Sequence, residues 1–470
     1  MIFQDLNNIN LKNIPVIIFG SGPAGITTSV ELEKKKIQSL IIEAGSETYS
    51  KTSQDFYRGK VTGDHLSDIS LSRLRQLGGT SGHWGGWSKP MENYSFDSWP
   101  IKAKDLEGYT DRTCKILGIK NQFNKSKLNN YFNQIQFQYS NVRFAEKYKK
   151  HIKNSKYIHL VLNTQLSHFE GENKVVTNAV CISRNLTKKI QSKYFILSCG
   201  GIENSRILLW AREQNKKLFT KNLPIGQYWM NHPWIIAGIG LGNKRELKKK
   251  LNNNFIDHDG PLHFAAKKKL LIDKKILSAA IYMNAKEDTK LVKEIVKDVL
   301  CVAPEYGKKI ARMIFNKDLK CGNIFMNLEE PPDENNKITL DKKEKDLFEI
   351  PRVNLFYKQS NDSKITAKIF LEEFADLCRK EDFGRIALKK NVDEMQEFET
   401  LDNHHHLGGT RIGDNPNTSV VDKNLKVHFI KNLFVSGSSI FFTGGYTNPT
   451  YTIVQLSLRL ADELYSKLNT

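Results

Sequence analysis

The pattern GSGPAG at residues 20–25 constrains the fold more than any other feature of the sequence. It separates an apolar stretch at residues 15–19 from a segment of helical character, and a second apolar stretch follows at residues 39–44. In a G-x-G-x-x-G turn, the first glycine permits a tight bend, the second lets a pyrophosphate approach the backbone, and the third lets the helix pack on the strand. A dinucleotide-binding strand–helix–strand unit is therefore predicted. Its expected ligand contacts are Gly20, Gly22, Pro23, Ala24 and Gly25.

An acidic residue stands where such a unit needs one. Glu43 ends the second apolar stretch, and a carboxylate at this position accepts hydrogen bonds from ribose hydroxyls. The glycine pattern and Glu43 together predict a bound dinucleotide, but they do not distinguish FAD from NAD.

The length of 470 residues favours two packed domains over one. Short strands at residues 159–198 lead into a glycine pair and a helix, which indicates that the chain returns to the first domain. We expect an α/β protein with a Rossmann-type nucleotide-binding domain and a discontinuous substrate domain, built on a mostly antiparallel sheet with helices near residues 288–314 and 361–380. The expected boundaries are residues 1–100, 155–232 and 401–470 for the nucleotide-binding domain, and residues 101–154 and 233–400 for the substrate domain.

The net charge of +20 comes mainly from lysines scattered along the whole chain, and no arginine-rich stripe alternates with aromatic residues. We therefore expect a solvated basic surface and no nucleic-acid partner. The six cysteines form no Cys-x-x-Cys pair, which is typical of a reduced, cytoplasmic protein. No signal peptide and no uncharged apolar run of about 18 residues stand out, so no transmembrane segment is predicted.

A second glycine-rich loop, LGGTSGHWGG, lies at residues 77–86. Its small residues let backbone amides reach a flat ring and its phosphates, and Trp84 can form a wall of the pocket. An ordinary glycine-rich turn is the alternative. The family resemblance given below implies that Gly79, Thr80, Ser81, His83, Trp84 and Gly85 of this loop contact the cofactor.

Three consecutive histidines, His404, His405 and His406, raise the possibility of a metal site. We predict no metal, because consecutive side chains diverge and no cysteine or carboxylate stands nearby at ligand spacing. Asn448 and Pro449 have a plain structural interpretation as the cap and first residue of the terminal helix.

These motifs together resemble the glucose–methanol–choline (GMC) oxidoreductase family, and most of all its sugar-oxidising branch of pyranose oxidases and bacterial glycoside dehydrogenases. The resemblance is carried by residues 14–46, 75–101, 194–209 and 403–464. It implies FAD as the cofactor and the oxidation of a primary or secondary alcohol group of a sugar or glycoside.

Within this resemblance, the segment from His406 to Thr410 matches the family's H-x-x-G-T. The match implies that His406 takes the proton of the substrate hydroxyl while hydride passes to flavin N5. Imidazole suits this role, because its pKa lies near neutral pH. Asn448 is similar to the asparagine that hydrogen-bonds the same hydroxyl in the sugar-oxidising members.

The resemblance also implies further cofactor contacts. His83 falls where pyranose oxidases carry a covalently attached flavin, although packing against the cofactor without a bond is the alternative. Gly437 lies in a segment, VSGSS, that is similar to the family's final flavin-contacting strand end, and His232 is a possible pocket residue. The remaining expected contacts are Pro449 and Thr450.

Three other functions stay open at this stage. The first is a GMC-type enzyme for a non-sugar alcohol, the second an NAD-dependent dehydrogenase, and the third a non-catalytic flavoprotein. The sequence does not determine the substrate, the electron acceptor or the oligomeric state.

Overall fold

The computed structural model describes residues 1–6, 14–183, 186–243, 251, 262–283, 319–399 and 404–469. The helix expected near residues 288–314 lies outside this part of the chain. Within it, no helix has both the length and the apolar composition needed to cross a lipid bilayer.

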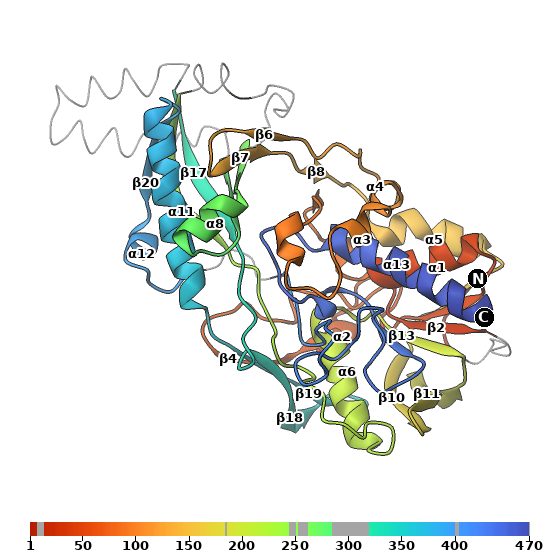
Figure 1. The fold of residues 1–470 in the computed structure, drawn as a ribbon. Coiled ribbons are helices and arrows are strands. Elements are labelled where there is room, and N and C mark those ends of the chain that lie inside the picture. The colour runs from red at the N-terminus through yellow and green to blue at the C-terminus, as the bar shows by residue number, and fades with distance from the viewer. Residues whose placement is uncertain are drawn as a thin grey trace.

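A six-stranded parallel sheet forms the centre of the nucleotide-binding part (Figure 1). Apart from the half-buried Ile2 and Phe3 at one edge, its strands are largely buried and rich in isoleucine, leucine, valine and phenylalanine, as expected for a parallel sheet that is covered on both faces. In spatial order they are β1 (Ile2–Phe3), β9 (Ile158–Val161), β3 (Ser39–Ile42), β2 (Val16–Phe19), β13 (Tyr194–Leu197) and β21 (Leu433–Val435).

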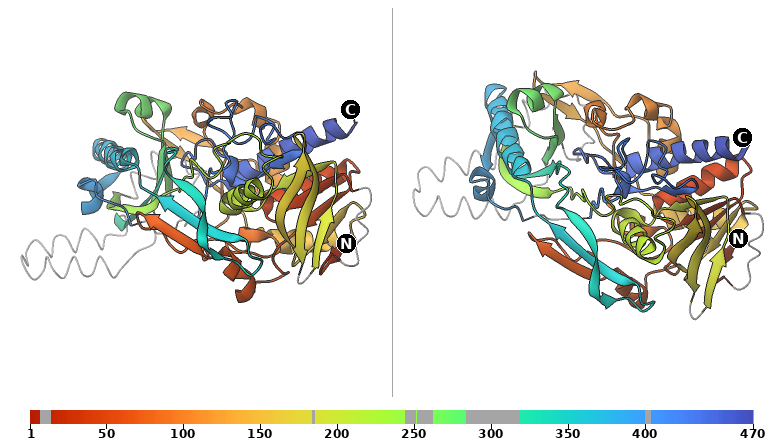
Figure 2. Two further views of the ribbon diagram at one scale, coloured as in Figure 1. Left: turned by 90° about the horizontal axis from the view of Figure 1, so that it is seen from below. Right: turned by 60° about the horizontal axis from the view of Figure 1, so that its bottom comes forward.

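Helices and a small sheet cover the two faces of this sheet. Helices α1 (Pro23–Lys34) and α13 (Thr450–Asn469) pack against each other on one face, next to α5 (Phe144–Asn154) (Figures 1 and 2). Helix α6 (Gly200–Gln214) lies on the other side and packs against β10. The small antiparallel sheet consists of β10 (Gln165–Glu172), β11 (Val175–Ser183) and β12 (Leu186–Ile190).

A seven-stranded sheet forms the second part of the molecule, and its described pairings are antiparallel. Helix α11 (Asn361–Lys380), where a helix was predicted, buries Phe370 and Phe374 against this sheet. The strands in spatial order are β20 (Gly384–Leu388), β14 (Trp234–Asn243), β17 (Leu319–Leu328), β16 (Ala279–Met283), β15 (Leu262–Ala266), β7 (Phe132–Ile135) and β6 (Lys125–Lys127). The two parts, one with a parallel and one with an antiparallel sheet, confirm the predicted fold class.

A third small sheet joins the two predicted domain ranges. Strand β4 (Gly59–Gly63) pairs with β19 (Pro351–Tyr357), which pairs in turn with β18 (Lys337–Lys345). The range 101–154 is also divided, because α5 packs on the nucleotide-binding sheet while β6 and β7 belong to the antiparallel one. The exact domain boundaries therefore stay a prediction.

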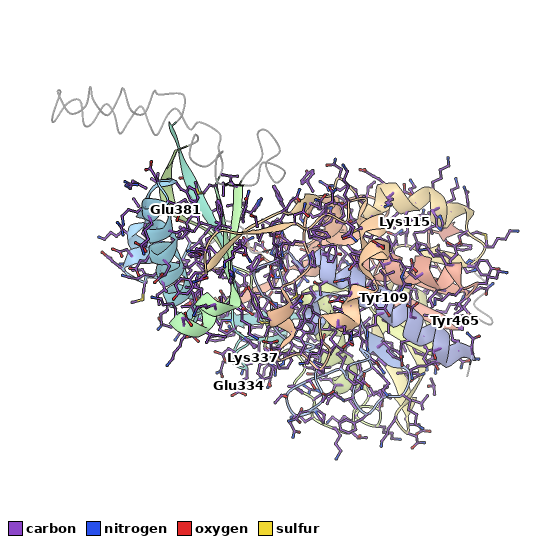
Figure 3. All side chains as sticks on the ribbon, turned by 45° about the horizontal axis from the view of Figure 1, so that its top comes forward. Tyr109, Lys115, Glu334, Lys337, Glu381 and Tyr465 are labelled. Carbon is purple, nitrogen blue, oxygen red and sulfur yellow. The ribbon has the colours of Figure 1, made fainter. Side chains whose placement is uncertain are left out.

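The segment from residue 104 to residue 117 is helical in two pieces. It consists of α3 (Lys104–Glu107) and α4 (Thr110–Leu117), with Gly108 between them. The remaining short elements are α2 (Lys51–Gln54), η1 (Asp55–Tyr57), η2 (Gly79–Gly82), β5 (Trp87–Ser88), η3 (Asn93–Phe96), β8 (Gln138–Tyr139), α8 (Lys268–Lys274), α12 (Lys390–Asp393) and η5 (Ser438–Ile440). Glu381, directly after α11, and Tyr465, near the end of α13, lie at opposite ends of the molecule (Figure 3).

Candidate active site

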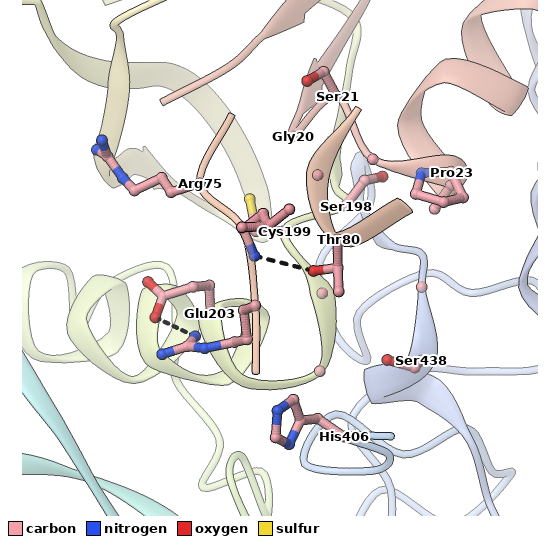
Figure 4. A pocket seen from close by; sticks show the side chains of 18 of the residues that line it. Gly20, Ser21, Pro23, Arg75, Thr80, Ser198, Cys199, Glu203, His406 and Ser438 are labelled. Atoms are coloured by element: carbon pink, nitrogen blue, oxygen red, sulfur yellow. Dashed lines mark hydrogen bonds and ion pairs between the residues drawn. The ribbon is translucent and has the colours of Figure 1, made fainter. Parts of the chain in front are cut away.

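A cavity opens at the carboxyl ends of the parallel strands, where open α/β sheets bind their ligands. Gly20, Ser21 and Pro23 lie on one side of it, and Glu203 and His406 on the other (Figure 4). His232, expected as a possible pocket residue, does not line it, but all but one of the residues predicted as catalytic residues or cofactor contacts do. They are Gly20, Gly22, Pro23, Ala24, Glu43, Gly79, Thr80, Ser81, His83, Trp84, Gly85, His406, Gly437, Asn448, Pro449 and Thr450.

Gly25 is the exception, and its surroundings give the reason. A Cβ atom on Gly25 would lie 2.0 Å from the carbonyl oxygen of Gly20, so this glycine lets α1 pack on the turn and does not face the ligand. At Gly22, by contrast, a Cβ atom would meet no atom within 4 Å. The open side of the turn is therefore the place where a pyrophosphate fits.

Glu43 is buried and held in place by the glycine turn. One carboxylate oxygen accepts hydrogen bonds from the Ser21 amide at 2.9 Å and the Ser21 hydroxyl at 2.7 Å. The other accepts one from the Gly45 amide at 2.7 Å. A carboxylate has about four acceptor positions, so Glu43 retains capacity for ribose hydroxyls.

The second glycine loop lies directly against the first. A Cβ atom on Gly79 would be 3.2 Å from the Cα atom of Gly22, and the Gly78 amide donates to the Ser21 carbonyl at 3.1 Å. Trp84 is fixed by a 2.8 Å hydrogen bond from its indole N–H to the carbonyl of Val142. The two loops together form one continuous wall of the cavity.

Three helices begin at this cavity: α1 after Gly22, α6 at Gly200 and α13 at Thr450. Helix N-termini present unpaired N–H groups and positive potential, which favour phosphates and other anionic groups. At Gly200, as at Gly22, a Cβ atom would meet open space. These residues fit a long, flat dinucleotide such as FAD.

A chain of buried charges that was not predicted from the sequence lies beneath the cavity. Arg73 donates to Glu203 at 2.9 Å, Glu203 accepts from Arg206 at 3.1 Å, and Arg206 reaches Asp346 at 2.6 Å. Burial alone would raise the pKa of Glu203, but Arg206 and Arg73 outweigh this effect and lower it. The position of Arg73 just before the second glycine loop is the sequence feature that could have indicated a buried charge near the cofactor.

His406 is buried beside these charges. Its Nε2 atom lies 2.7 Å from the Ser72 hydroxyl, and its ring packs against Trp229 at 5.8 Å between ring centroids. Its Nδ1 atom has no hydrogen-bond partner among the described residues. Burial, and then the nearby Arg73 and neighbouring histidines, hold the pKa of His406 well below its usual value. The ring is therefore a neutral imidazole with one nitrogen left for a ligand.

His405, and not His406, contacts Asn448. The Asn448 amide nitrogen lies 3.5 Å from His405 Nε2, while His405 Nδ1 lies 3.0 Å from His232 Nδ1. A backbone bridge between Met230 and Leu407 places the two imidazoles opposite each other. His232 is the residue that the sequence predicts as a possible pocket residue, whereas no role is predicted for His405.

His83 lies at the exposed part of the cavity wall and stacks on His404, with ring centroids 5.6 Å apart and planes 8° apart. The described histidine, cysteine and carboxylate side chains form no group of three that suits a metal ion.

Comparisons with known proteins show which family model and which proteins this chain is similar to. Residues 332–457 match the family model described as GMC oxidoreductase. The chain is 26% identical over 310 residues to the fructose dehydrogenase large subunit of Gluconobacter japonicus, covering 64% of this chain and 52% of that protein. It is 25% identical over 286 residues to a 2-methyl-1,2-propanediol dehydrogenase of Mycolicibacterium austroafricanum, covering 58% and 48%. The chain thus spans about half the length of these relatives.

Solved structures share the whole fold. Pyridoxine 4-oxidase from Mesorbium loti superposes with a TM-score of 0.63 at 13% identity, covering 97% of this chain and 99% of that one. An FAD-dependent oxidoreductase from Chaetomium thermophilum gives 0.58 at 14% identity, covering 97% and 100%.

Replacing Gly22 should separate ligand binding from folding. Gly22→Leu should keep the melting temperature but lose the bound dinucleotide, because its side chain enters open cavity space. Gly25→Leu, the matched control, should lower stability by about 1–3 kcal/mol or more through overpacking. Flavin absorbance and thermal unfolding measure the two effects. Full flavin retention in Gly22→Leu would contradict the assignment of this turn.

Proposed function

This chain belongs to the GMC oxidoreductase family, and we propose on that basis that it is an FAD-dependent enzyme that oxidises an alcohol group of a sugar or glycoside. One observation carries the proposal. A single cavity runs from the glycine turn and Glu43 to the imidazole of His406 and the amide of Asn448. A dinucleotide in the turn therefore has its reactive end beside a proton acceptor.

The cofactor is FAD, held by the two glycine loops, Glu43 and the N-termini of α1, α6 and α13. The chemistry that bound FAD supplies is acceptance of a hydride from the substrate carbon. An NAD-dependent dehydrogenase on the same sheet would leave the second glycine loop and the histidine–asparagine wall without a function.

His406 removes the hydroxyl proton in this proposal. An alcohol carbon releases hydride readily only as its oxygen loses a proton, so the base must be neutral and close to the reacting position. Its lowered pKa keeps His406 neutral, and the hydrogen bond with Ser72 fixes the ring. Asn448 orients the hydroxyl, and burial of the ring excludes water.

The names of the two similar dehydrogenases bear on the substrate. Both similar dehydrogenases are named for substrates with more than one hydroxyl group, fructose and 2-methyl-1,2-propanediol. These names support a sugar as the first candidate substrate and a small diol as the second.

The spacing of the cysteines still supports a cytoplasmic location.

The two proposed catalytic residues should differ in their effect. His406→Ala should retain FAD but lose about 10²–10⁴-fold in the rate of flavin reduction, because it removes the proton acceptor. Asn448→Ala should lose less, because other contacts still orient the hydroxyl. Anaerobic mixing with substrate measures this step alone. Near-normal flavin bleaching in His406→Ala would assign the base to another residue.

The pH profile should reflect the lowered pKa of His406. The ring accepts a proton only when deprotonated, so activity persists above its pKa and falls as the pH drops through that value. We expect flavin reduction to stay constant from about pH 8 down to the usual histidine pKa of about 6.5, and to decline only below it. A midpoint at or above the usual value would contradict a base in this buried position.

Covalent attachment of FAD at His83 is a separate proposal. If the bond exists, acid denaturation should leave the yellow colour on the polypeptide, and His83→Ala should release it. His404→Ala serves as the control, since it removes the stacking partner of His83 and leaves His83 itself in place. Colour that separates from the unmodified protein would establish non-covalent binding.

A further inference from the structure

One face of the antiparallel sheet carries a continuous strip of aromatic rings. Tyr282 of β16 and Phe325 of β17 are cross-strand partners, and their rings stack with centroids 4.7 Å and planes 6° apart. The ring centroid of Trp234 in β14 lies 5.8 Å from that of Phe325, and His263 of β15 lies 5.6 Å from Tyr282. Trp87 of β5 extends the strip at 5.3 Å from His263. All five rings are half-buried, while alternate residues of β15, β16 and β17 pack under α11.

Both ends of this aromatic strip lie beside the active-site cavity. At one end, Trp234 follows His232 by two residues, and His232 Nδ1 is 3.0 Å from Nδ1 of the cavity-lining His405. At the other end, Trp87 adjoins the cavity wall, because a Cβ atom on the cavity-lining Gly85 would lie 3.4 Å from its ring. A ligand that extends from the cavity toward the sheet therefore meets these rings.

The loop that carries Asn448 packs directly on the same face of the sheet. A second row of this face aligns Ala265 with Ala280 and Ala280 with Asn327. The two alanines form a buried cluster with Tyr446, which stands two residues before Asn448. Their small side chains leave room for the tyrosine ring, so this loop and the sheet are held together.

The aromatic strip lies at some distance from this loop. Directly after β17, a carboxylate oxygen of Glu329 accepts a hydrogen bond from the Gly445 amide at 3.2 Å. Phe325, Asn327 and Glu329 alternate along one face, and four residues of strand span about 13 Å. This length exceeds that of one pyranose ring. A substrate that reaches both the Asn448 loop and the stacked rings is therefore longer than a monosaccharide.

Asn327 supplies a polar group between the loop and the rings. Its side chain is half-buried and makes no hydrogen bond to a described residue. An amide both donates and accepts, which suits the hydroxyl groups of a sugar. Aromatic faces carry negative potential and attract the C–H groups on the apolar face of a sugar ring. Ligand sites combine aromatic walls with a few polar groups in this way.

We propose that the aromatic strip and Asn327 bind a second sugar ring that is joined to the ring being oxidised. The substrate class is therefore disaccharides and longer glycosides, and not free monosaccharides. This inference rests on the proposed function, the oxidation of a sugar hydroxyl by bound FAD.

Disaccharides and their component monosaccharides test the proposal. Anaerobic flavin reduction is measured with cellobiose, lactose, maltose and sucrose, and with glucose, galactose and fructose. At least one disaccharide should reduce the flavin with a second-order rate constant about tenfold above that of either component, the effect expected of one well-placed ring contact.

Variants of the strip should remove this preference selectively. Trp234→Ala and Asn327→Ala should each lower the rate constant with the preferred disaccharide by about three- to tenfold, while the monosaccharide rate constants stay within about twofold. Trp234→Phe retains a ring and should keep most of the preference. Phe356→Ala removes an exposed ring from β19 and is the matched control, which should leave all rate constants unchanged. FAD content and melting temperature are measured for each variant.

The outcomes separate the two proposals. No flavin reduction with any of the seven sugars would overturn the proposed function and this inference with it. Reduction by monosaccharides without a faster disaccharide would overturn the inference alone. So would an equal loss with both kinds of sugar in Trp234→Ala, because the ring would then support the reacting position. If Trp234→Ala does not fold, an unchanged disaccharide preference in Asn327→Ala overturns the inference.

Discussion

The buried ionic chain from Arg73 through Glu203 and Arg206 to Asp346 is the interaction on which the cavity depends. It joins three segments that are distant in sequence: the approach to the second glycine loop, α6, and the turn between β18 and β19. Each charge is nearly excluded from water, so removal of Glu203 or Arg206 leaves a neighbouring charge buried without its ion-pair partner in this chain. The floor of the cavity is therefore fixed as a unit.

This ionic chain also sets the position of the proposed base. Ser72 precedes Arg73 directly, and its hydroxyl meets His406. On the other side, a Cβ atom on Gly201 would lie 2.1 Å from the His406 carbonyl oxygen, so α6 approaches this loop as closely as a backbone can. The imidazole is thus held between two segments that Arg73 and Glu203 already connect, and the Ser72 hydroxyl fixes the ring.

The sequence predicted the parts of this protein that depend on local patterns. The glycine turn, Glu43 and the strand–helix–strand unit follow from residues close to one another, and each has a known steric purpose. The partner of Asn448 did not follow, because neighbouring histidines point in different directions and only the bridge between Met230 and Leu407 decides which one faces the amide. The Arg73–Glu203 ion pair could not be predicted from the sequence either, because its two residues approach each other only after α6 has packed.

The last part of the chain completes the structure that the first part begins. Strand β21 closes the edge of the parallel sheet, and α13 packs on α1 while its first residues line the cavity. During synthesis on the ribosome, the glycine turn emerges long before its covering helix, with apolar strands left unpaired for most of that time. The cofactor therefore has a finished site only after α13 has packed on α1, and a chain without α13 leaves apolar surface exposed that favours aggregation.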